Sequence, residues 1–271
     1  MKRFCLLPAL LIAIGFTTLH AQPTTKKLKK ALELKIPREG GARAASVAWH
    51  PVQKKYYAAI AGNAIFSLGV YNVNGVLLSP ATQKTFFDVR GLWYNPNTKT
   101  LQTNGYNDFG WAEYKLNAKG FPDTVKYLYD GMKQPDVQSA GAFDPKKKFV
   151  YFLNADGDID IYDYKDATFS ETFELHLGLT KEKDDGTQDN YDVIEDYNST
   201  TVIFTGIPGA ELGLLNYTER QIELYSAKDG YLVRKLSLPD DAPAEDLLCF
   251  AYANGIYWLF DREARIWKGY K

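Results

Sequence analysis

Short apolar or alternating runs recur along the chain between Asn-Gly, Asp-Gly and Pro turns, and no stretch of helical length keeps a 3.6-residue apolar period. One recurring pattern is an apolar run that ends in an aromatic residue and a turn, at 47–51, 91–96 and 141–145. A strand pattern follows each of these runs, at 56–60, 101–103 and 149–153. The pattern predicts repeated β-sheet units.

Two less regular units follow, at 191–194 with 202–204 and at 247–252 with 256–260. In each of the five units an aromatic residue closes the predicted third strand: Tyr71, Tyr114, Tyr162, Tyr225 and Trp267. The repeat length of roughly 45 to 60 residues is typical of four-stranded propeller blades. The sequence therefore predicts an all-β propeller of about five four-stranded blades.

Fourth strands are predicted at 124–128, 173–177 and 232–238, whereas the fifth unit reaches Lys271 without one. The segment 32–37 alternates as 235–239 does, and it precedes the first unit with no partner of its own. We expect this N-terminal strand to pair in the last blade and close the ring, because closure removes an exposed sheet edge.

The pairs Tyr71-Asn72, Tyr162-Asp163 and Trp267-Lys268 stand where WD40 repeats carry Trp-Asp. Over residues 28–271 the chain resembles the broad β-propeller superfamily of WD40-like and NHL-like repeats, although the Gly-His dipeptide and the Asp-His network of WD40 repeats are absent. Some five-bladed propellers are glycoside-acting enzymes with acidic residues along the central channel, so the resemblance implies either a binding module or such an enzyme.

The N-terminal residues resemble a bacterial export signal. Lys2 and Arg3 precede an apolar run from Phe4 to Phe16, and Ala21 offers a cleavage position. We expect a signal peptide at 1–21, a single propeller domain at 22–271, and a periplasmic or secreted protein. The run of about 13 apolar residues is short for a membrane span, and no transmembrane segment is expected after its removal.

Removal of the signal peptide changes the cysteine count and the charge. Cys249 is left alone, which rules out an intramolecular disulfide, and we expect it to be a buried apolar residue. Without Lys2 and Arg3 the chain carries 30 basic and 33 acidic residues, a formal charge of −3. This balance gives no argument for binding to nucleic acid or to an anionic membrane.

The sequence contains no clear motif for a metal or cofactor site. The segment 154–160 superficially resembles a calcium loop, but its sixth residue is Ile159 and its twelfth would be Lys165, so a hairpin turn at Asp156-Gly157 is favoured over a cation site. His50 and His176 are too few for a His-rich metal centre, and no G-x-S-x-G nucleophile motif is present. We assign no metal, no cofactor and no catalytic residue.

Residues at the predicted starts of the innermost strands should meet at one end of the central channel: Arg43, Asp88, Arg90, Gln138, Asp192 and Glu245. Two carboxyl groups about 6.5 to 9.5 Å apart would suit an inverting glycosidase. The alternative is that Arg43 and Arg90 neutralise Asp88 and Glu245 as a polar lining of the channel.

The loop 104–111 should open on the same face, and it contributes Tyr106, Asn107, Asp108, Phe109 and Trp111. Aromatic faces beside amide and carboxylate groups suit a sugar or peptide ligand. The alternative is that these rings pack between blades. A second candidate loop lies at 206–213, and the polar segment 181–190 is expected to be a solvated loop or, alternatively, a docking loop.

We conclude from the sequence that the protein is an exported propeller that binds a protein partner, a glycan or a peptide on the face formed by 104–111 and the inner-strand starts. A carboxylate-dependent, glycan-acting enzyme is the second hypothesis. A structural component of the cell envelope is the third.

Overall fold

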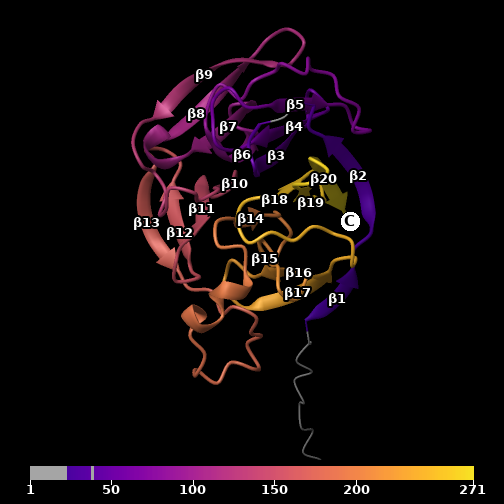
Figure 1. Cartoon of the computed structure of the whole chain (residues 1–271). Coiled ribbons are helices and arrows are strands. Elements are labelled where there is room, and N and C mark those ends of the chain that lie inside the picture. The colour runs from indigo at the N-terminus through magenta and orange to yellow at the C-terminus, as the bar shows by residue number, and fades with distance from the viewer. Residues whose placement is uncertain (1–22, 38–39) are drawn as a thin grey trace, which may run out of the picture.

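The computed structural model describes residues 23–37 and 40–271, and the described residues form five sheets arranged around a central axis (Figure 1). The fold is the all-β, five-bladed propeller predicted from the sequence. The predicted signal peptide at 1–21 lies outside the described residues. Within them no helix is long and apolar enough to cross a membrane.

The blades follow one another in chain order, each with its first strand innermost. Blade 1 contains β3 (Ala44–His50), β4 (Lys55–Ile60) and β5 (Leu68–Tyr71). Blade 2 contains β6 (Val89–Asn95), β7 (Thr100–Gly105), β8 (Trp111–Leu116) and β9 (Pro122–Tyr129). Blade 3 contains β10 (Ala142–Asp144), β11 (Phe149–Leu153), β12 (Ile159–Asp163) and β13 (Thr168–Phe173).

Blade 4 contains β14 (Ile203–Phe204), β15 (Leu212–Asn216), β16 (Gln221–Tyr225) and β17 (Leu232–Ser237). Blade 5 contains β18 (Phe250–Ala253), β19 (Ile256–Asp261) and β20 (Ile266–Tyr270). The three-stranded blade 1 has its outer edge covered by the segment that follows β5, through isolated bridges at Leu77 and Lys84. All five aromatic residues predicted to close third strands lie in those strands.

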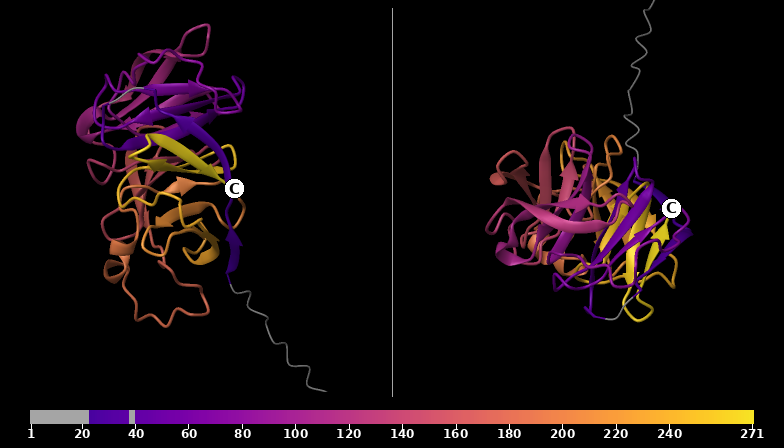
Figure 2. Two further views of the ribbon diagram at one scale, coloured as in Figure 1. Left: turned by 45° about the vertical axis from the view of Figure 1, so that its right-hand side comes forward. Right: turned by 90° about the horizontal axis from the view of Figure 1, so that it is seen from above.

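The N-terminal strand closes the ring, as predicted. Strand β2 (Lys30–Lys35) pairs antiparallel with β20, and Leu34 lies opposite Trp267 with both side chains fully buried. A second strand, which the sequence did not predict, precedes it: β1 (Thr24–Lys27) pairs parallel with β17 at the edge of blade 4. Figures 1 and 2 show β1 and β2 as one belt along the outside of blades 4 and 5, so the first described residues join two blades.

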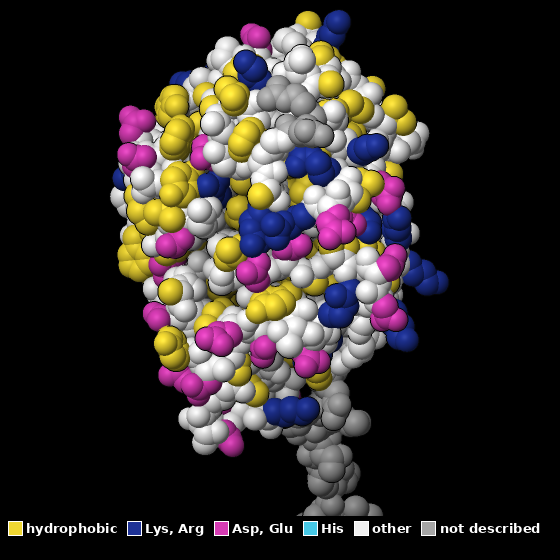
Figure 3. Space-filling model, viewed as in Figure 1, with side chains coloured by type: hydrophobic (Ala, Val, Ile, Leu, Met, Phe, Trp, Pro, Cys, Tyr) yellow, Lys and Arg dark blue, Asp and Glu magenta, His cyan; other side chains and the backbone are white. Residues whose placement is uncertain are grey.

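The antiparallel order of strands sets two faces. The loops that lead into the inner strands and the loops between second and third strands share one face, called here the top face. The turns that follow the inner strands lie on the bottom face. Figures 1 and 3 view the top face, where basic and acidic side chains mix near the centre.

The fourth unit differs from the prediction. Residues 190–196 form two short 3-10 helices, η2 (Asn190–Asp192) and η3 (Ile194–Asp196), and the inner strand is β14. The loop 206–211 therefore follows an inner strand and lies on the bottom face, not on the top face as predicted. The predicted fourth strand at 173–177 was also wrong, because β13 ends at Phe173.

Two local predictions are confirmed. Residues 154–158 form a hairpin turn between β11 and β12, in which the side-chain oxygen of Asn154 accepts the N–H groups of Asp156 and Asp158. Cys249 is 1% exposed and unpaired, and burial raises the pKa of its thiol to about 12. A thiol of such high pKa is a packing residue rather than a nucleophile.

Candidate functional site

One charged group at the top of the channel is built around Arg90, in inner strand β6. Its guanidinium forms a 2.7 Å ion pair with Asp88 and donates a 2.7 Å hydrogen bond to Gln138. The ring of Tyr106 lies 4.6 Å from it in a cation–π contact. Asp88 also accepts the N–H of Gly62 at 2.8 Å. The prediction that Arg90 neutralises Asp88 is confirmed, and the nearly buried pair ties the loops of blades 1, 2 and 3 together.

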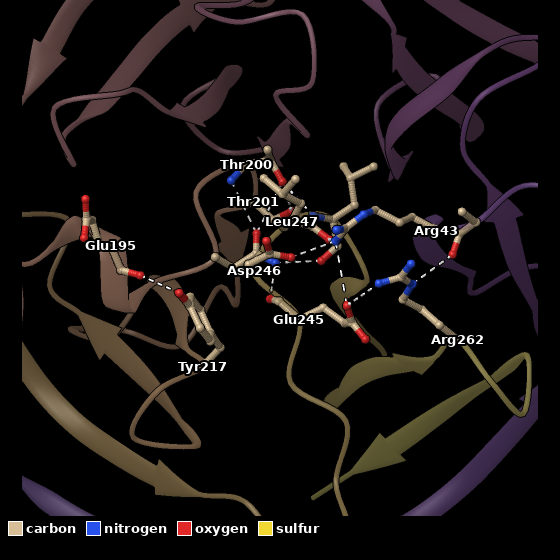
Figure 4. Close-up of polar contacts among 12 residues, drawn as sticks. Arg43, Glu195, Thr200, Thr201, Tyr217, Glu245, Asp246, Leu247 and Arg262 are labelled. Atoms are coloured by element: carbon tan, nitrogen blue, oxygen red, sulfur yellow. Dashed lines mark hydrogen bonds and ion pairs between the residues drawn. The ribbon is translucent and has the colours of Figure 1, made fainter.

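A second charged group lies across the mouth, between blades 1 and 5 (Figure 4). Arg43 forms ion pairs with Asp246 at 2.9 Å and with Glu245 at 3.7 Å. Arg262 forms a 3.2 Å ion pair with Glu245 and donates to the carbonyl of Ala42. Arg43 therefore neutralises Glu245 as predicted, although the stronger partner of Glu245 is Arg262, a residue that the sequence analysis did not select.

Two of the predicted carboxylates at the channel mouth are paired with arginine. Arg90 holds Asp88, and Arg262 and Arg43 hold Glu245, so both carboxylates serve as partners of protein cations in the free protein. Asp192 is not at an inner-strand start at all, because it lies exposed in η2. The prediction that it joins the channel mouth was wrong.

The aromatic loop at 104–111 is partly core. Trp111 is fully buried and packs against Trp93, Tyr129 and Phe152, so the prediction that its ring is offered to a ligand was wrong and the alternative of packing between blades holds. Phe109 is half-buried against Phe87. The accessible part of the loop is Tyr106, Asn107 and Asp108.

Asn104 fixes this loop to the next blade. Its side-chain oxygen accepts the N–H groups of Gly91 and Gly141 at 2.9 Å, and its amide donates to Gln134 and to the carbonyl of Ser139. A Cβ atom at Gly91 would lie 2.5 Å from both that oxygen and the carbonyl oxygen of Gly141, so glycine is required there. This contact sets the relative position of blades 2 and 3 at the top face.

Beside the charged mouth, a cleft of about 600 Å³ opens between blades 3 and 4. Its acidic lining residues are Asp136, Glu195 and Asp246. Its uncharged polar lining residues are Gln138, Asn154, Tyr197, Ser199, Thr200 and Tyr217. Leu153, Ala155, Ile194 and Leu247 supply apolar wall. The volume lies within the range of ligand pockets.

The wall of the cleft is anchored from beneath. Tyr197 donates a 2.8 Å hydrogen bond to Glu223, which is 1% exposed and also accepts from Tyr225 at 2.5 Å. Lys235 lies 3.3 Å from the same carboxylate. Tyr217 donates to the backbone carbonyl of Glu195 at 2.7 Å (Figure 4). These contacts fix η3 while the carboxylate of Glu195 stays exposed, without a hydrogen bond or ion pair to any described residue.

Of the predicted residues, only Gln138 lines this cleft, and Arg43, Asp88, Arg90, Tyr106 and Glu245 form its neighbouring rim. Glu195 and Tyr217 were missed because the sequence analysis took 191–194 as the first strand of the fourth unit and 202–204 as the second. In the structure the first strand is β14 (Ile203–Phe204). Tyr217 belongs to the loop between β15 and β16, which is a top-face loop once β15 is recognised as the second strand.

No protein-family model and no curated protein sequence matches the chain. Among solved structures, a glutaminyl cyclase from Myxococcus xanthus is similar over 92% of this chain and 98% of its own, with a TM-score of 0.57 and 6% sequence identity. A protein of unknown function from Bacteroides thetaiotaomicron is similar over 90% of this chain and 75% of its own, with a TM-score of 0.52 and 11% identity. At such identities the similarity concerns the fold.

Proposed function

We propose that the protein is an exported binding propeller whose top-face cleft takes a peptide, or a segment of a protein partner, through a positively charged group. The cleft of Asp136, Glu195 and Asp246 carries this proposal. Its described lining residues include three carboxylates and no lysine or arginine. Ammonium and guanidinium groups are the partners that carboxylates bind best.

The exposure of the three carboxylates supports a binding role. Asp246 is exposed although it pairs with Arg43, and among the described residues the carboxylate of Asp136 accepts only the N–H of Gln138. Glu195 has no partner among the described residues. A ligand cation beside Asp136 or Glu195 therefore displaces water rather than a protein ion pair, which keeps the cost of binding low. Beside Asp246 it competes with Arg43.

The same lining favours a peptide over an anionic glycan, because the three carboxylates would repel uronate, sulfate or phosphate groups. Tyr217 and the apolar wall at Ile194 and Leu247 offer surface for the side chain next to the cationic group. A neutral glycan would find fewer hydrogen-bond donors here than acceptors.

The test is a pair of peptide panels titrated against the mature protein. One panel compares free with acetylated amino termini, and the other compares lysine with norleucine at internal positions. We expect loss of the ammonium group to weaken binding at least tenfold, a change of about 1.4 kcal/mol. The panel that shows this loss tells whether the terminus or the side chain is bound.

Matched variants locate the site. Glu195→Gln combined with Asp136→Asn removes two carboxylates of the cleft at little structural cost, and it should weaken the same peptide about tenfold or more. Asp240→Asn combined with Asp241→Asn is the control, because both residues are exposed and neither lines the cleft. Equal effects from the two variants would refute the assignment.

An enzyme remains the second candidate, and the full-length similarity to a glutaminyl cyclase favours it. If this chain shares that activity, it will convert a glutaminyl peptide at a rate that Glu195→Gln lowers. Tight binding of the glutaminyl peptide without turnover would support the binding function and argue against this activity. Export is tested separately, by sequencing the amino terminus of the protein from the cell envelope and from the medium, where we expect Gln22.

A further inference from the structure

The central channel presents a different surface at the opposite end. A cavity of about 250 Å³ is lined by all five inner strands, and it reaches the exposed turn residues Pro51 and Asn254. It therefore opens on the bottom face. The described residues that line it include no charged side chain.

An aromatic residue from each blade lines this cavity: Trp49, Tyr94, Phe143, Phe204 and Tyr252. The first three occupy the same repeat position, two residues before the proline that ends the inner strand. All except Phe143 are partly exposed. The cavity, called here the five-ring socket, combines the apolar surface of these rings with polar atoms such as those of Ser46 and Thr201. It has room for one compact group, such as an aromatic or large aliphatic side chain.

The turns that follow the inner strands of blades 1 to 3 are basic. Lys54, Lys99 and Lys148 occupy equivalent positions with φ between 51° and 60°, and Lys146 and Lys147 precede the last of them. All five side chains are exposed. Lys147 acts electrostatically on Glu211, whereas no carboxylate of the described residues pairs with the other four.

We propose that the bottom mouth of the channel binds an acidic peptide segment that inserts one aromatic or large aliphatic side chain into the five-ring socket. Charge complementarity selects an acidic partner. The lysines are spread over three blades, so they match several negative charges along a chain better than the single charge of a small ligand. The socket accepts only one apolar group at a time.

The probe is a capped heptapeptide of Glu and Asp with Phe at its centre, titrated calorimetrically at low and at physiological salt. Two further peptides carry Ala in place of Phe, or Gln and Asn in place of Glu and Asp. We expect each change to weaken binding about tenfold, and we expect added salt to weaken binding of the acidic peptides.

Charge-reversed variants place the site. Lys146→Glu with Lys148→Glu should weaken the Phe peptide about tenfold or more, whereas Lys126→Glu with Lys183→Glu, at exposed positions elsewhere, should leave it unchanged. Phe204→Ala should lower affinity, whereas Phe169→Ala, 53% exposed on outer strand β13, should not. Thermal unfolding checks that each variant is folded.

Equal loss in the two charge-reversed pairs would overturn the proposal, as would equal binding of the Phe and Ala peptides. Binding to vesicles that contain anionic lipid, without binding to the peptide at about 1 mM, a concentration that detects even weak association, would assign the basic turns to a membrane surface instead. These results are independent of the top-face cleft, whose variants leave the bottom turns intact.

Discussion

Replacement of Asn104 by leucine tests how the top face is held together. The side chain is fully buried and makes four hydrogen bonds, two as acceptor from Gly91 and Gly141 and two as donor to Gln134 and Ser139. Leucine has a similar size and shape but no polar atom. The change therefore leaves the backbone N–H groups of Gly91 and Gly141 without an acceptor in the interior of the blade 2–3 junction.

Each buried polar group left without a partner costs about 1 to 3 kcal/mol, so two N–H groups alone predict about 4 kcal/mol. The carbonyl of Ser139 and the amide of Gln134 add to this, while the apolar leucine side chain and any water that enters offset part of it. We expect the free energy of unfolding to fall by about 3 to 5 kcal/mol, near the upper end for a point substitution.

Urea unfolding monitored by tryptophan fluorescence and by circular dichroism measures the change, and coincident transitions justify a two-state analysis. Asn74→Leu is the control, because its side chain is exposed and its loss should cost under about 0.5 kcal/mol. A loss below about 1 kcal/mol for Asn104→Leu would refute the role of this residue as the clamp between blades.

Three further predictions follow from closure, the charged mouth and buried tyrosines. Leu34→Ala in β2 should lower stability by about 2 to 5 kcal/mol in urea unfolding, whereas the exposed neighbour change Glu33→Ala should not, and equal effects would argue against closure by this strand. Arg90→Met should lower the free energy of unfolding by about 3 kcal/mol, because it leaves the nearly buried Asp88 without its cation. Arg43→Ala, at a side chain 26% exposed, should lower it by only about 1 kcal/mol. The reverse order would contradict the burial of the Asp88–Arg90 pair. Burial raises the pKa of Tyr270 to about 12, above about 10 in the unfolded chain, so its stabilising contribution is complete below about pH 10 and is lost as the pH rises toward 12. Urea unfolding at about pH 8 and pH 11 should show lower stability at the higher pH, and unfolding at pH 11 should add tyrosinate absorbance beyond that of exposed tyrosines such as Tyr127 and Tyr191. A folded protein at about pH 11 that already shows the full absorbance of the unfolded chain would contradict the burial of Tyr270.

The sequence predicted most of the propeller because blades 1 to 3 repeat strong local signals. An apolar run, an aromatic residue and a proline turn mark the inner strands β3, β6 and β10. Closure was predictable because 32–37 had strand alternation and no partner. Strand β1 was not, since Thr24–Lys27 is fully exposed and has no apolar alternation.

The prediction of blade 4 was wrong for physical reasons. Its inner strand has only two residues, Ile203 and Phe204. The glycines and the proline at 206–213 are typical of a loop, so the sequence does not indicate that β15 begins at Leu212. Residues 191–194 alternate like a strand, but the side chain of Asp189 accepts the N–H of Tyr191 and starts a 3-10 turn. This local hydrogen bond outweighs the alternation.

The sequence predicted that the candidate site lies on the top face, but not that it is the cleft between blades 3 and 4. Inner-strand starts do meet at the top, but sequence cannot tell which of their charges pair with one another. Trp111 begins a strand and points into the blade 2–3 core, and period-2 alternation alone does not say which side of a strand faces the neighbouring blade.

A crystal structure of the mature protein with its tightest-binding peptide tests the proposed function most directly. We predict that the peptide lies in the cleft between blades 3 and 4, with its cationic group beside Asp136, Glu195 and Asp246. A peptide found outside that cleft, with Glu195 exposed to solvent as in the free protein, would contradict the assignment of the top face.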